Sequence, residues 1–117
     1  MNVIKRNGDI VPFDAERIVK AINKAFLEVD GILYETDTAT DIAEEVESIA
    51  KVLFNNPKAE MLNVERIQDL VEDYLMRSER KDVARAYIRY RYKKEVARNI
   101  KSDFFDAIGE KLQASNI

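Results

Sequence analysis

The chain has 117 residues, with 19 basic and 22 acidic side chains, no His and no Cys, and 46% of its residues are hydrophobic. These figures describe one globular domain that can bury a core without disulfides or a structural metal. The missing residue types exclude thiolate nucleophiles, Ser-His and Cys-His catalysis, and zinc sites of the usual Cys/His kind. Any metal must therefore bind to oxygen ligands.

The sequence contains no apolar run that approaches the roughly 20 residues of a membrane span. Its first residues, Met-Asn-Val-Ile-Lys-Arg, also lack the apolar stretch of a signal peptide. We therefore expect a cytoplasmic protein without a membrane partner.

A β-hairpin is predicted at the start of the chain. Short apolar segments flank Asn7-Gly8, a dipeptide that readily adopts the positive φ angles of a two-residue turn. The predicted register places Arg6 opposite Asp9 and Lys5 opposite the residue that follows Asp9.

Two amphipathic helices are predicted next. Asp14 is placed to cap the first helix, and Asp30-Gly31 closes it. The second helix is capped by Asp37 or Thr38 and stops before residues 55–57. The apolar residues of the two helices recur at helical spacing, and they are Ile18, Ile22, Ala25, Phe26 and Val29 in the first and Ala39, Ile42, Ala43, Val46, Ile49, Ala50 and Leu53 in the second.

The second half of the chain is predicted to be mainly helical. Residues 59–62 form a short strand, and Asn63 caps a third helix. Ser78 caps a fourth helix that runs from about residue 79 to 101. Residues 1–101 are therefore expected to form one domain, and residues 102–117 to begin a linker or a catalytic domain. The apolar stripe of the third helix is Val64, Ile67, Leu70, Val71 and Tyr74.

Charge is distributed unevenly along the chain. Residues 30–76 hold twelve acidic and three basic side chains, a net of −9, whereas residues 77–101 hold ten basic and three acidic ones, a net of +7. Arg85, Arg89 and Lys93 follow each other at i, i+4 spacing, where like charges repel. This basic helix is either a solvated face, a face that meets the acidic block, or an anion site. Its interleaved tyrosines also leave open a nucleic-acid-binding or purely interacting module.

Three segments in this order resemble the ATP-cone domain: residues 3–18, 64–71 and 84–94. The resemblance spans roughly residues 2–100. It implies an α+β fold, in which a four-helix arrangement is covered by a small three-stranded sheet that includes the N-terminal β-hairpin. It also implies a regulatory site for ATP or dATP as an allosteric effector, bound with Mg2+. A phosphate-binding glycine loop is absent, so side-chain cations must hold the phosphates.

The resemblance assigns residues to this nucleotide site by position. Three groups are implied: residues of the first strand, turn and first helix that line the nucleotide, residues near the adenine, and a phosphate-facing cation on the last helix. In that order they are Val3, Lys5, Arg6 and Arg17; Val64 and Gln68; and Lys93. One departure is Val11, because the family often has Glu there.

The resemblance implies that the chain senses adenine nucleotides and regulates a ribonucleotide reductase by shifting its oligomeric state. The partners would be the remainder of the reductase chain and further copies of it, with nucleic acid disfavoured. The segment from Tyr87 to Ser102 resembles the anaerobic, glycyl-radical class of ribonucleoside-triphosphate reductase. A reductase-gene repressor is disfavoured because its zinc ribbon needs Cys. This chain alone would not turn over a substrate.

Overall fold

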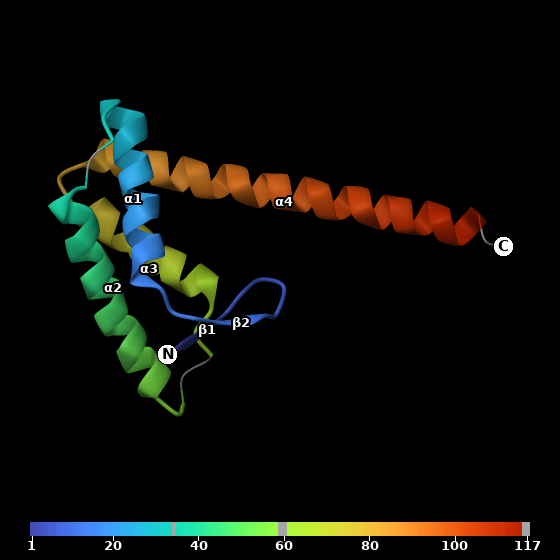
Figure 1. Cartoon of the computed structure of the whole chain (residues 1–117), viewed down its shortest axis with the longest axis horizontal. Helices are drawn as coiled ribbons and strands as arrows, with labels where there is room; N and C mark the ends of the chain where they lie inside the picture. Colours follow the sequence, from blue (N-terminus) through green and yellow to red (C-terminus); the bar gives the residue numbers. More distant parts are fainter. Residues whose placement is uncertain (34, 59–60, 116–117) are drawn as a thin grey trace. The chain divides into compact units, whose positions relative to one another are not determined.

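The computed structural model of the chain describes residues 1–33, 35–58 and 61–115 (Figure 1). It confirms the α+β class, with four helices and one antiparallel pair of strands in the described residues. The chain divides into two compact units, Met1–Tyr87 and Ile88–Ile117. The elements in chain order are β1 (Asn2–Ile4), β2 (Ile10–Pro12), α1 (Ala15–Asp30), α2 (Asp37–Asn55), α3 (Val64–Arg77) and α4 (Lys81–Ser115).

The hairpin forms, but the predicted register is wrong. Val3 pairs with Val11, and the Lys5 N–H donates to the Asp9 carbonyl at 2.8 Å. A two-residue turn of the expected type needs positive φ at both Asn7 and Gly8, whereas only Gly8 has it, at 90°. The loop is therefore three residues long, and Arg6 lies in the loop instead of opposite Asp9.

The predicted third strand is reduced to a single contact. Residues 59 and 60 lie outside the described residues, and Met61 and Leu62 are not in a strand. The Ile4 N–H donates to the Leu62 carbonyl at 2.9 Å, and Ile4 forms an isolated parallel bridge with Asn63. Asn63 is already the cap of α3, so the chain turns into the helix before a ladder can extend. A sheet that covers the helices is not observed in the described residues.

The first helix begins and ends as predicted. Asp14 accepts a hydrogen bond from the Glu16 N–H at 3.0 Å, and Gly31 ends α1 in a left-handed conformation with φ of 72°. The N–H of Gly31 donates to the Leu27 carbonyl at 2.8 Å.

The cap of α2 differs from the prediction, because it is Thr36 and neither Asp37 nor Thr38. The Thr36 hydroxyl accepts from the Ala39 N–H at 3.1 Å and donates to Asn23 Oδ1 at 2.8 Å. Asn23 and Thr36 are both buried. A tertiary partner on α1 therefore selects Thr36 over its two neighbours.

The core of the first unit is built from α1, α2, α3 and the first turns of α4. A smaller cluster packs Val3 of β1 against Ala50 and Leu62, so the hairpin is held on the helices by its first strand. Side chains that are fully buried hold the larger core together, and the biggest are Ile22, Leu75, Val46, Val71 and Val83.

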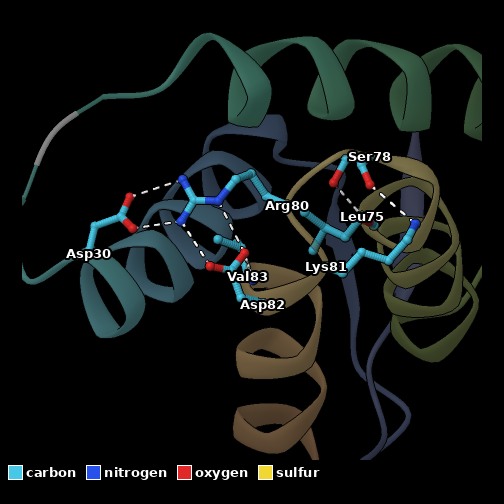
Figure 2. Close-up of polar contacts among 7 residues, drawn as sticks. All are labelled: Asp30, Leu75, Ser78, Arg80, Lys81, Asp82 and Val83. Carbon is cyan, nitrogen blue, oxygen red and sulfur yellow. Dashed lines mark hydrogen bonds and ion pairs between the residues drawn. The ribbon is translucent and has the colours of Figure 1, made fainter.

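The turn from α3 to α4 is fixed by polar contacts around Arg80 (Figure 2). Its guanidinium donates to Asp30 at 2.6 and 3.2 Å and to Asp82 at 3.1 and 3.2 Å, and it lies over the ring of Phe26 at 5.3 Å. Ser78 was predicted to cap α4, but it ends α3 instead. Its hydroxyl donates to the Leu75 carbonyl at 2.6 Å. The contact of Arg80 with Asp30 joins the start of α4 to the end of α1.

The fourth helix is longer than predicted, because it continues to Ser115 instead of ending near residue 101. In the second unit its described side chains are mostly exposed, including Tyr92 and Ile100. Within residues 1–33, 35–58 and 61–115, no helix is long and apolar enough to cross a membrane. The domain boundary at residue 101 stays a prediction.

Candidate functional site

A small cleft lies where the hairpin loop meets the start of α3. Its volume is about 230 Å³, and the contact between Ile4 and Leu62 holds its two sides together. Small-molecule pockets usually measure about 300–1,000 Å³. The volume of this cleft is smaller, and it matches only part of a nucleotide. The residues that line it are Ile4, Lys5, Arg6, Asn63, Val64 and Glu65.

Two cations lie side by side on the hairpin side of the cleft. Lys5 is the last residue before the three-residue loop and is exposed. Arg6 is the first loop residue. Its side chain is 26% exposed, and its Nε lies 3.3 Å from Glu65 Oε1. Lys5 and Arg6 were both predicted as site residues, and the structure brings them together with Val64.

The other side of the cleft is the first turn of α3. The Asn63 side chain accepts from the Arg66 N–H at 2.7 Å, which fixes the point where the helix begins. The N-terminal end of a helix carries a partial positive charge that favours anions. Glu65 already places one carboxylate in this turn. The cleft therefore combines two cations, a helix N-terminus and one resident anion.

Gln68 lies one helical turn after Val64 on α3. Its Oε1 atom is buried and has no hydrogen-bond partner among the described residues. A buried carbonyl oxygen without a partner is unfavourable by about 1–3 kcal/mol, so native structures rarely keep one without a reason. Gln68 itself does not line the cleft.

Three further predicted residues lie elsewhere. The Val3 side chain is 3% exposed and packs in the small cluster, so it does not line the cleft. Arg17 is an exposed residue of α1 whose Nε is 3.9 Å from Asp14 Oδ2, and it is also absent from the lining. Lys93 is exposed on α4 in the second unit. Val11, the departure from the family pattern, is partly buried opposite Val3.

Sequence reasoning did not single out Ile4, Asn63 or Glu65 as site residues, although all three line the cleft. The Asn63 cap was recognised, and it locates a helix N-terminus from which the position of Glu65 follows. The described part of the chain contains no group of three acidic, His or Cys side chains that would hold a metal ion.

Comparison with known proteins gives a family and several relatives. The family model described as the ATP cone domain matches residues 1–96, which confirms the resemblance. The chain is 35% identical to the ribonucleoside-diphosphate reductase subunit alpha of Chlamydia pneumoniae, over 91% of the chain and 11% of that protein. It is also 35% identical to the anaerobic ribonucleoside-triphosphate reductase of Haemophilus influenzae, over 98% of the chain and 15% of that protein.

A third relative is the vitamin B12-dependent ribonucleoside-diphosphate reductase of Thermoplasma acidophilum, at 38% identity over 85% of the chain and 12% of that protein. The chain thus spans between 11% and 15% of the length of these three relatives. Their identities to the chain are similar, although their names belong to different kinds of reductase.

Proposed function

The chain belongs to the ATP-cone family, and from that premise we propose that it senses ATP and dATP and regulates the overall activity of a ribonucleotide reductase. ATP-cone domains bind these nucleotides as allosteric effectors. We assign the reductase to the anaerobic class, which is among the relatives and which the segment after Tyr87 resembles. The catalytic groups would lie in the part of the reductase that this chain does not span.

The observation that carries the proposal is the cleft formed by Lys5, Arg6 and the first turn of α3. Charge-assisted hydrogen bonds from Lys and Arg to phosphate are roughly twice as strong as neutral ones. In the absence of a glycine-rich loop, these two side chains are the natural phosphate ligands. Lys93 is proposed as a further phosphate-facing cation and Arg17 as a residue beside the nucleotide, both from the family resemblance.

The base is proposed to lie along α3, next to Val64 and Gln68. The 6-amino group of adenine is an N–H donor, whereas guanine carries a carbonyl oxygen at the same position. We propose that the 6-amino group of adenine donates to Gln68 Oε1, a contact that the guanine carbonyl oxygen cannot make with the same atom. This oxygen supports a preference for adenine over guanine.

Mg2+ is proposed to enter with the triphosphate and to be held mainly by phosphate oxygens and water, as this ion commonly is.

ATP and dATP differ by one hydroxyl, and one net hydrogen bond contributes about 0.5–1.5 kcal/mol, which is at most roughly tenfold in affinity. A difference between the effects of ATP and dATP therefore needs different bound structures. We propose that loss of the ribose contact repositions the hairpin or α4 and thereby shifts the oligomeric state of a cytoplasmic reductase.

Isothermal titration of the chain with ATP, dATP and GTP, each with Mg2+ and at two salt concentrations, tests the proposal. We expect ATP and dATP to bind and GTP to give little response. A nucleic-acid-binding module would instead bind single-stranded oligonucleotides, with an affinity that falls steeply and log-linearly with salt. Absence of binding to ATP and dATP would contradict the proposed function.

A further inference from the structure

The ion pair between Arg6 and Glu65 crosses the proposed nucleotide cleft from one side to the other. The Arg6 Nε lies 3.3 Å from Glu65 Oε1, and both residues line the cleft together with Lys5. Glu65 belongs to the first turn of α3, where the helix dipole favours its carboxylate. The Glu65 carboxylate is therefore already paired with Arg6, one of the two cations to which we assign the phosphates.

A bound triphosphate and this carboxylate cannot share the cleft without a change. The volume of about 230 Å³ is below the usual range for a small-molecule pocket. Two anions a few ångströms apart repel each other, most strongly where solvent is partly excluded. The Arg6 side chain is such a partly enclosed group, with 26% of its surface exposed, whereas Glu65 is 52% exposed and has solvent into which it can turn.

We infer that Glu65 is a resident counter-ion of Arg6 that the phosphates of the nucleotide displace, so that Glu65 sets the affinity of the site and couples its occupancy to the hairpin loop. Arg6 exchanges one anion for another when the nucleotide binds. The exchange ends the contact between Arg6 and Glu65 by which the loop is tied to α3. This inference rests on the proposed nucleotide site and adds its regulation.

The test compares binding to wild type and to Glu65→Gln, which keeps the size of the side chain and removes its charge. The probes are ATP, AMP and inorganic tripolyphosphate, measured by isothermal titration. We expect Glu65→Gln to bind ATP and tripolyphosphate about two- to fivefold more tightly, the range of one ion pair that is partly exposed. The gain should be small for AMP, which brings fewer charges to Arg6.

Two further variants isolate the mechanism. Glu45→Gln removes the same charge from an exposed position on α2, and it should leave the affinity unchanged. In an Arg6→Gln background, Glu65→Gln should lose most of its gain, because the cation for which the two anions compete is gone. A merely structural role would instead lower the melting temperature of Glu65→Gln and leave binding unchanged or weaker.

The outcomes separate this inference from the proposed function. If wild type binds ATP and Glu65→Gln binds it no more tightly, the inference is overturned and the nucleotide site stands. If ATP binds neither form but tripolyphosphate binds Glu65→Gln more tightly, the exchange stands and the nucleotide function is overturned. If neither probe binds either form, both are overturned.

Discussion

The proposed site depends on single side chains with different tasks, and Lys5 has the simplest one. It is exposed and supplies a charge without holding the fold together. Lys5→Ala should weaken ATP binding by about 1.5–3 kcal/mol, the contribution of a hydrogen bond to a charged group. Titration calorimetry measures the loss, and Lys20→Ala, an exposed charge on α1, is the matched control. Equal affinities for wild type and Lys5→Ala would remove Lys5 from the site.

Substitution of Gln68 should change the stability of the free protein and its affinity for ATP in opposite directions. Its buried Oε1 has no partner among the described residues, so Gln68→Met should leave the free protein equally stable or up to about 1 kcal/mol more stable. The same change should weaken ATP binding by about 0.5–1.5 kcal/mol, because the acceptor for the amino group is lost. Urea unfolding and calorimetry measure the two quantities. A variant that loses stability and keeps its affinity would show that Gln68 acts only in the fold.

At the scale of elements, the hairpin loop positions Arg6 and depends on one left-handed residue. Gly8 has φ of 90°, and a Cβ added there meets nothing within 4 Å, so only backbone strain opposes Gly8→Ala. We expect a loss of about 1–2 kcal/mol in the free energy of unfolding, together with weaker ATP binding.

Gly31→Ala is a matched control for the hairpin, since Gly31 has φ of 72° and equally open surroundings at the end of α1. It should destabilise the protein by a similar amount and leave ATP affinity unchanged. If Gly8→Ala binds ATP as wild type does, the conformation of the loop does not matter to the site.

The start of α4 is a second element that matters to the fold. The hydrogen bonds between Arg80 and Asp82 at this point depend on pH. The hydrogen bond from the Arg80 side chain lowers the pKa of Asp82 below its ordinary value of 3.8, against an opposing effect of desolvation. A lowered folded-state pKa stabilises the fold at pH values above the ordinary one, and this contribution is lost as the pH falls through the folded-state pKa. Asp82→Asn should therefore be less stable than wild type at pH 6, and the difference should shrink below pH 3.8.

Melting curves of wild type and Asp82→Asn across this pH range measure that difference. Asp73→Asn, an exposed carboxylate on α3, is the control for the change in net charge. A stability difference that stays constant down to the lowest pH would contradict the linkage.

For the whole molecule, local signals predicted what depends on local geometry. The Asp14 and Asn63 caps and the apolar stripes of the helices follow from spacing and side-chain chemistry, and they were correct. Two contacts that depend on a distant residue were not foreseen. Asn23 selects Thr36 as the cap of α2, and Arg80 reaches Asp30 across the fold. No spacing along the chain announces either contact.

The site shows the same division. The neighbouring cations Lys5 and Arg6 were recognisable in the sequence, but the pairing of Arg6 with Glu65 requires the hairpin register and the start of α3 in three dimensions. The register was missed because Asn7-Gly8 permits both a two-residue and a three-residue loop. Only the paired strands distinguish the two.

The predicted boundary at residue 101 can be tested on the whole chain. Every buried residue of the described core lies at or before Tyr87, so a fragment of residues 1–101 retains the core, both cleft cations and Lys93. We expect this fragment to melt at the same temperature as the chain of 117 residues and to bind ATP equally well. A fragment of residues 1–77 lacks Val83 and Tyr87 and should not fold, because several buried apolar side chains are removed at once. If residues 1–101 melt several degrees lower or bind more weakly, the domain includes the later part of α4, and the boundary is wrong.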